Sequence, residues 1–147
     1  MNVGNRQDAE AAVELQKRAL ACGAFDYRGA GVFAAWQWWR GSDRVAWRPP
    51  GSEAVYKVEI SPGTNALEDE TMSLGRREGR PWAPETRLLP CDDIEVLAMQ
   101  YFAEPIDSIE EIPTDAHQIV PDLLISNFRR RADGQVMVID AGDPSPR

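Results

Sequence analysis

The stretch DLLISNFRRRADGQVMVIDAG, residues 122–142, decides how the rest of this chain is interpreted. Its Asp133-Gly134 pair is typical of a tight hairpin turn, and the apolar run 136–139 after it is rich in strand-forming residues. The turn predicts two arms that lie side by side, with a carboxylate, Asp140, at the end of the second. An ordinary β-hairpin without a functional site explains the same pattern and stays open as an alternative.

Polar side chains stand on both arms of this hairpin. If the arms pair, Asp122 and Asn127 lie near Asp140. Two carboxylates and a carboxamide that converge in this way suit phosphoryl transfer, because one carboxylate can accept a hydroxyl proton while the other joins the amide in holding Mg²⁺. We therefore expect Asp122 as catalytic base and Asn127 and Asp140 as metal ligands.

At these residues the chain resembles the protein-kinase-like superfamily, which includes eukaryotic-type kinases and related small-molecule phosphotransferases. The family's catalytic loop ends in D-x-x-x-x-N, which matches Asp122 and Asn127, and its later D-F-G is matched by Asp140-Ala141-Gly142. The chain departs from the family at Val120-Pro121, where His-Arg is usual, and at Ala141, where Phe is usual. The resemblance implies a nucleotide and Mg²⁺ as cofactors.

A second point of resemblance is Ala54-Val55-Tyr56-Lys57, which is similar to the V-A-I-K strand of the family. There the lysine pairs with nucleotide phosphates, so Lys57 is implied in that role. Gly41 and Ser42 stand 16 and 15 residues earlier, where the family's first hairpin covers the phosphates. The full G-x-G-x-x-G is absent, and a lysine on the outward face of an amphipathic strand is the alternative for Lys57.

The segment 65–77 is predicted to be a helix, with Leu67 and Leu74 among charged residues. In the family a glutamate from such a helix pairs with the strand lysine. Glu68 and Glu70 both qualify, and the spacing to Leu67 and Leu74 favours Glu70. A position on a solvated helix face is the alternative for either residue.

Two strand candidates follow, 86–89 and 94–102, separated by a turn at 90–93. In the family the second of these runs into a hinge whose backbone receives adenine. By position, the resemblance implies that Met99 guards that pocket and that Gln100-Tyr101-Phe102 forms the hinge.

These elements predict an α+β fold in one kinase-like domain. We expect an N-terminal helical extension over 1–30 whose helix covers 7–22, and a small-lobe-like part over 31–102 with a curved antiparallel sheet of about five strands plus one helix. Residues 103–147 are expected to form a strongly reduced second lobe that carries the catalytic-loop hairpin, with linking helices that are short or missing.

Composition narrows the function classes. The chain has 147 residues, 43% hydrophobic and 27% charged, and no apolar stretch of spanning length, so we expect a globular cytoplasmic protein without a membrane segment. The net charge of −8 disfavours a nucleic-acid surface, and the basic run Arg129-Arg130-Arg131 is predicted to be a solvated hairpin arm. Cys22, Cys91 and His117 form no metal-ligand spacing.

The sequence therefore predicts a minimal kinase-like protein that binds ATP and Mg²⁺ and transfers phosphate to a hydroxyl of a small molecule or a protein. The alternative is a non-catalytic, pseudokinase-like binding protein or inhibitor. It would use an acidic rim and the tryptophan-rich segment from Trp36 to Trp47 as anchors. A homo-oligomer in which a second copy completes the shortened lobe is compatible with either function.

Overall fold

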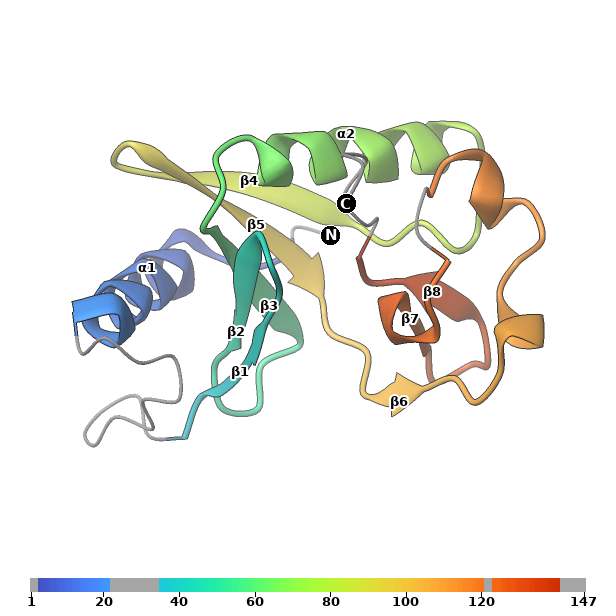
Figure 1. Ribbon diagram of the computed structural model, residues 1–147, viewed down its shortest axis with the longest axis horizontal. Helices are drawn as coiled ribbons and strands as arrows, with labels where there is room; N and C mark the ends of the chain where they lie inside the picture. The colour runs from blue at the N-terminus through green and yellow to red at the C-terminus, as the bar shows by residue number, and fades with distance from the viewer. Residues whose placement is uncertain (1–2, 22–34, 121–122, 141–147) are drawn as a thin grey trace. The chain divides into compact units, whose positions relative to one another are not determined.

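The structure is a computed structural model, which describes residues 3–21, 35–120 and 123–140 (Figure 1). The chain forms two compact units. Unit 1 comprises Met1–Ala66 and Arg87–Tyr101, and unit 2 comprises Leu67–Thr86 and Phe102–Arg147.

Unit 1 is built on an antiparallel sheet of five strands in the order β1-β2-β3-β5-β4. The strand bounds are β1(Gln37–Arg40), β2(Arg44–Arg48), β3(Ala54–Glu59), β4(Thr86–Cys91) and β5(Ile94–Gln100). Successive side chains of a strand point to opposite faces of the sheet. Trp47, Tyr56 and Ala98 are paired across the strands and share one face, while Lys57 and its partner Leu97 share the other.

Helix α1(Arg6–Ala21) packs on the sheet face that carries Trp47, Tyr56 and Ala98 (Figure 1). Its buried positions recur every three or four residues, which is the spacing of one helix face. Gln16 is buried among them because its side chain is satisfied. Its Oε1 accepts a hydrogen bond from Trp47 Nε1 at 2.9 Å, and its Nε2 donates to the carbonyl of Glu59 at 3.2 Å.

Helix α2(Thr64–Arg77) begins in unit 1 and continues in unit 2. Unit 2 also holds the three-stranded antiparallel sheet β6(Glu104–Pro105), β7(Phe128–Arg130) and β8(Val136–Val138), in that order. Three short 3-10 helices precede β7 in the chain, and they are η1(Ile109–Glu111), η2(Ala116–Gln118) and η3(Ile125–Asn127).

Trp82 is the largest fully buried side chain of unit 2. Its Nε1 donates to Asp115 Oδ1 at 3.1 Å, and its carbonyl accepts from the amide of Val138 at 3.0 Å. Arg80 Nη1 donates to the other oxygen of Asp115 at 2.7 Å. Segment 80–84 is therefore fastened both to η2 and to the end of the β7–β8 hairpin.

The structure confirms the expected α+β class, the five-stranded antiparallel sheet and the hairpin turn at Asp133-Gly134, where Gly134 has φ 93°. Helices at the predicted places run from Arg6 and from Thr64, each within one residue of the expectation. The expected small-lobe-like part and reduced remnant meet at residues 102 and 103, and the two units meet at 101 and 102. Unit 2 also includes most of α2 and the segment to Thr86, in which Arg80 and Trp82 are bonded to Asp115 and Val138.

Two strand ends differ from expectation. The turn predicted at 90–93 is shorter, because β4 continues through Pro90 to Cys91 and the chain reverses at Asp92, whose φ is 56°. Pro90 fits there because β4 is the edge strand, where a missing N–H costs no ladder hydrogen bond. Strand β5 ends at Gln100, so Phe102 lies outside the sheet.

Candidate functional site

Lys57 lies in the middle of β3, on the sheet face opposite the one that α1 covers. Ala46 and Leu97 are its direct neighbours on the adjacent strands. Only 6% of the residue is exposed. This low exposure shows that Lys57 is not the outward-facing surface residue of the alternative interpretation. Burying an ammonium group costs free energy unless other groups compensate for it.

Asn65, in the first turn of α2, is fully buried beside the backbone of Lys57. Its Nδ2 donates to the carbonyl of Lys57 at 2.8 Å and to the carbonyl of Glu95 at 2.9 Å. Its backbone N–H donates to Glu59 Oε2 at 2.9 Å. Sequence reasoning missed this residue, because an asparagine at a helix start looks like an ordinary capping residue.

The two candidate glutamates of α2 differ in burial. Glu68 is only 3% exposed, whereas Glu70 is an exposed residue. The sequence favoured Glu70 because its spacing to Leu67 and Leu74 suggested a common apolar face. In the structure those two leucines are themselves exposed, so they do not mark the buried face of the helix.

Gly41 and Ser42 form the tight turn between β1 and β2. The amide of Gly41 donates to the carbonyl of Arg44 at 2.8 Å, and Ser42 Oγ donates to Asp43 Oδ2 at 3.3 Å. The carbonyl of Asp43 accepts from the amides of Ile60 and Ser61. The turn has the expected place in the sheet, and the Gly41 amide is already engaged in closing it.

Met99 is fully buried at the end of β5, opposite Val55 on β3, and Gln100 ends the strand opposite Ala54. The chain leaves the sheet at Tyr101, whose amide donates to the carbonyl of Glu53 at 2.7 Å. Phe102 is buried in unit 2, and its carbonyl accepts from Arg129 Nη1.

An aromatic cluster lies beside this strand end. The ring of Trp39 stacks on Tyr101 with centroids 6.1 Å apart, and the guanidinium of Arg48 lies 3.9 Å from the centre of the Tyr101 ring. Trp39 is 37% exposed. Trp47 is buried and Trp38 packs against it, so of the described tryptophans in the segment from Trp36 to Trp47 only Trp39 is exposed.

In unit 2 the hairpin brings Asn127 and Asp140 together. The carbonyl of Asn127 accepts the amide of Ile139 at 2.8 Å and that of Asp140 at 3.4 Å. Asn127 is buried, and Asp140 is half-buried. The predicted catalytic base, Asp122, and the Ala141-Gly142 pair lie outside the described residues.

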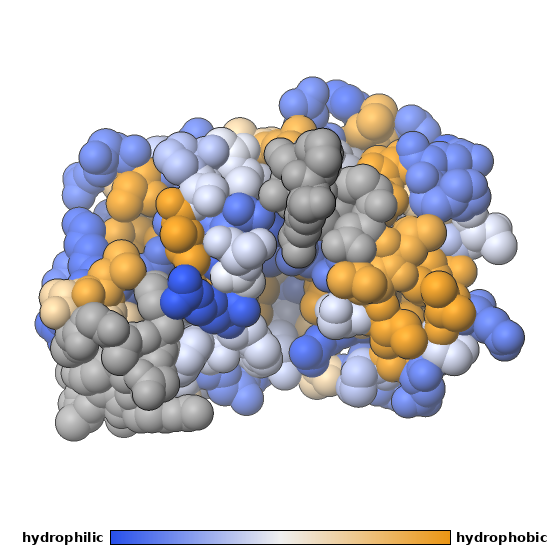
Figure 2. All heavy atoms as spheres, viewed as in Figure 1, coloured by the Kyte–Doolittle hydropathy of each residue, from blue (hydrophilic) through white to orange (hydrophobic). Residues whose placement is uncertain are grey.

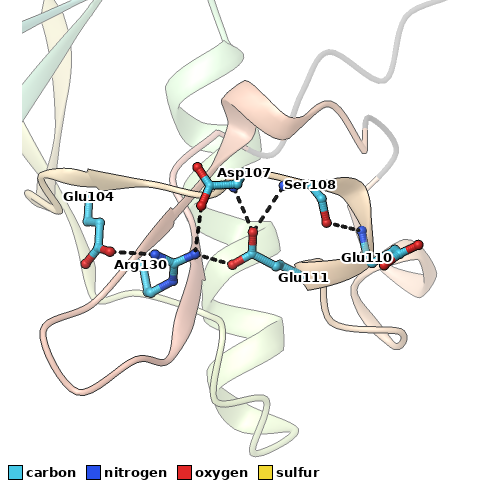
Figure 3. A network of polar contacts seen from close by, with 6 residues as sticks. All are labelled: Glu104, Asp107, Ser108, Glu110, Glu111 and Arg130. Carbon is cyan, nitrogen blue, oxygen red and sulfur yellow. Dashed lines mark hydrogen bonds and ion pairs between the residues drawn. The ribbon is translucent and has the colours of Figure 1, made fainter.

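The predicted solvated arm of three arginines is wrong for Arg130. Its guanidinium bonds to Glu104 and Glu111 and lies 4.0 Å from Asp107 (Figure 3). This hydrogen bonding from Arg130 holds the pKa of Glu111 below its usual range. The acidic segment 104–111 and the basic strand β7 therefore neutralise one another within unit 2. The sequence did not predict these ion pairs because the two segments are far apart in it.

The side chains of η1 complete this network. Glu111 also accepts the amides of Asp107 and Ser108, while Ser108 Oγ accepts the amide of Glu110 (Figure 3). The result is a capping box that closes η1 on itself. Glu111 is therefore held from two directions and in turn holds Arg130.

Elsewhere in the described residues there is little that could bind a metal ion through protein side chains alone. In residues 3–21, 35–120 and 123–140, no group of three or more His, Cys, Asp or Glu residues is placed so that it could hold a metal ion. Cys91 is a buried free thiol whose pKa is raised by burial, and His117 is exposed. A Mg²⁺ ion at Asn127 and Asp140 would need oxygen ligands from a bound nucleotide and water.

Of the helices in the described part of the chain, none is both long and apolar enough to cross a membrane. Large apolar side chains are nonetheless exposed in unit 2, and hydrophobic residues gather over its C-terminal elements on the face drawn in Figure 2. The large apolar side chains that are exposed in unit 2 are Leu67 and Leu74 on α2, and Ile109, Leu124 and Ile125 further along the chain.

No family model, curated protein or solved structure matches this chain.

Proposed function

We propose that this chain is a minimal kinase-like protein that binds ATP with Mg²⁺ and transfers the terminal phosphoryl group to a hydroxyl acceptor. Lys57 would contact the phosphates, and Asn127 and Asp140 would hold the metal ion. Asp122 would accept the proton of the acceptor hydroxyl, which is either a small molecule's or a protein's.

The observation that carries the proposal is the pairing of Asn127 with Asp140. They are 13 positions apart in the sequence, yet the amide of Asp140 reaches the carbonyl of Asn127 at 3.4 Å. The Asp133-Gly134 turn sets the register of the two arms. This register places a carboxamide residue and a carboxylate residue at the same end of it, and these are the oxygen donors that Mg²⁺ prefers.

The burial of Lys57 supports the proposal from the other unit. A lysine at the centre of a strand with only 6% exposure carries a desolvation cost that surface lysines do not. Glu68 is buried as well, and its burial favours it over the exposed Glu70 as the carboxylate that would accompany Lys57. Catalysis of phosphoryl transfer depends mainly on such fixed charges and on positioning.

The chain has two lysines, Lys17 and Lys57, so contact between Lys57 and a nucleotide can be tested by lysine labelling. An acyl phosphate of ATP transfers its acyl group to a lysine that lies beside the phosphates. Lys17, the other lysine, is exposed on α1 and serves as an internal control. We expect mass spectrometry to find Lys57 acylated, with ATP plus Mg²⁺ protecting Lys57 and leaving Lys17 unaffected. Equal labelling of both lysines with no protection would contradict nucleotide binding.

The metal-binding half of the site is tested by calorimetry with ATP and Mg²⁺. Asp140→Ala should weaken binding by about tenfold or more, because it removes one of two protein ligands of the metal ion. Asp107→Ala is the matched control, since that carboxylate is 89% exposed and lies in the same unit. No heat from the unmodified protein at millimolar nucleotide would refute the proposal.

The chemical step is tested by phosphoryl transfer from radiolabelled ATP. We expect Asp122→Ala to abolish this transfer and to retain nucleotide binding.

A second candidate, a binding protein without catalysis, is favoured by the cluster of Trp39, Tyr101 and Arg48. Exposed tryptophan held by stacking is a common anchor at protein interfaces, because little side-chain freedom is lost on binding. This candidate predicts that Lys57 is not protected by ATP. It also predicts that Trp39→Ala, and not Asp140→Ala, abolishes the protein's biological effect.

A further inference from the structure

The strands β3 and β5 are joined at one end by a side chain instead of by backbone. Their paired register runs from Ala54 opposite Gln100 to Lys57 opposite Leu97. Just beyond the last pair, the carboxamide of Asn65 donates one hydrogen bond to the carbonyl of Lys57 and a second to the carbonyl of Glu95. Asn65 therefore bridges the two strands at the residue that carries the buried ammonium group.

The carboxamide suits this place because it is a double donor and an acceptor at once. Both hydrogen bonds of Nδ2 go to strand carbonyls, while Oδ1 accepts from Arg44 Nη1 at 3.4 Å. A serine has one hydroxyl donor, and an ionised aspartate has none. Thr64 Oγ1 lies 3.0 Å from the carbonyl of Ser61 and 3.2 Å from Glu59 Oε2, and its single proton donates to one of them at a time. Glu59 Oε2 also accepts the backbone amide of Asn65.

We propose that Asn65 is a positioning residue for Lys57. By holding the carbonyl of Lys57 against that of Glu95, it fixes the peptide plane that follows Lys57 and hence the direction in which the side chain leaves the strand. The same carboxamide ties this strand to the first turn of α2. The importance of Lys57 for phosphate rests on the proposed function, whereas the geometric effect of Asn65 does not.

Asn65→Asp separates this role from ordinary helix capping. A carboxylate in the first turn of a helix is as good as asparagine or better for the helix itself. Facing two carbonyl oxygens, however, it offers no donor and repels both. A capping role therefore predicts an unchanged or more stable protein, and a positioning role predicts a displaced Lys57.

Two control variants accompany Asn65→Asp. Thr64→Val removes a neighbouring hydroxyl from the helix start and leaves the three hydrogen bonds of the Asn65 carboxamide in place. Val58→Ala removes a buried side chain next to Lys57 on the face that α1 covers, so it lowers stability without touching the bridge. We expect labelling of Lys57 by the ATP acyl phosphate, relative to Lys17, to fall about tenfold or more in Asn65→Asp, because small misplacements of reacting groups carry large rate penalties. Both controls should stay within about twofold of the unmodified protein.

Labelling of Asn65→Asp at the unmodified level would overturn the inference, as would an equal loss in Val58→Ala. A second readout needs no nucleotide. It is the rate at which a small amine-reactive acylating reagent modifies Lys57, measured across pH on the folded proteins. That profile should change in Asn65→Asp and stay unchanged in both controls. If the unmodified protein is not labelled by the ATP reagent, the proposed function fails, and the nucleotide-free profile alone decides the role of Asn65.

Discussion

At the scale of single residues, Gly75 shows how a tertiary contact can reverse a local preference. Glycine inside a helix normally costs about 1 kcal/mol relative to alanine, so Gly75→Ala in α2 would stabilise an isolated helix. Here an added Cβ would lie 2.8 Å from the Cβ of Ala83, with the ring of Trp82 at 3.5 Å. Overpacking of this kind costs about 1–3 kcal/mol. We therefore expect Gly75→Ala to lower the free energy of unfolding in urea titrations.

The double variant Gly75→Ala with Ala83→Gly supplies the control. Removing the opposing methyl group relieves the contact, so the two substitutions together should cost less than their sum. Additive costs would mean that the clash is absorbed elsewhere. A stabilised single variant would show that α2 does not approach segment 82–83 this closely.

At the scale of elements, Arg130 joins three parts of unit 2 that are far apart in sequence. Its guanidinium on β7 bonds to Glu104 of β6 and to Glu111 of η1. Loss of this residue leaves the β6 and η1 carboxylates facing one another without a cation. We expect Arg130→Gln to lower the urea midpoint of unfolding and to expose the segment 104–111 to proteolysis.

Arg131→Gln is the matched comparison, since its guanidinium pairs with Asp133 within the same hairpin turn. That pair links residues two apart, so its loss should leave segment 104–111 protected. Equal effects of the two substitutions would show that Arg130 contributes only local charge to the hairpin.

At the scale of the whole molecule, the charged groups predict a stability profile that falls at both pH extremes. The pKa of Glu111 is lowered by Arg130, that of Asp115 by Arg80 and Trp82, and that of Asp133 to about 2 by Arg131. Folded-state pKa values below the unfolded ones mean that the stability from these carboxylates is present above about pH 4 and is lost as pH falls through the folded values.

The alkaline limit comes from two buried groups. Burial raises the pKa of Cys91 above its ordinary 9.0 and that of Tyr56 above its ordinary 10.0. Because the unfolded chain ionises first, their contribution is complete below those ordinary values and is lost as pH rises beyond them. We expect urea midpoints that are flat from about pH 5 to pH 8 and lower at pH 3 and pH 10. A midpoint at pH 3 equal to that at pH 7 would contradict the assignment of these carboxylates.

Local sequence was sufficient to predict helices α1 and α2 and the β7–β8 hairpin. The apolar spacing of 7–22 and 65–77, and the Asp133-Gly134 turn, depend on residues within a few positions of one another, so both helices and the hairpin could be predicted from pattern alone. The juxtaposition of Asn127 and Asp140 followed from the same turn, because hairpin register is local.

Only the tertiary structure decided which charged groups are buried and what they contact. Glu68 and Glu70 lie two positions apart in the sequence, and both are candidates to pair with Lys57. Glu68 is buried and Glu70 is exposed because only one face of α2 is buried. Arg130 bonds to Glu104 and Glu111, which are 26 and 19 positions away in the sequence. Asn65 bonds to the carbonyl of Glu95, which is 30 positions away. Contacts at such separations depend on how whole elements pack, which no local propensity encodes, and for that reason the bridging role of Asn65 emerged from the fold and not from the chain.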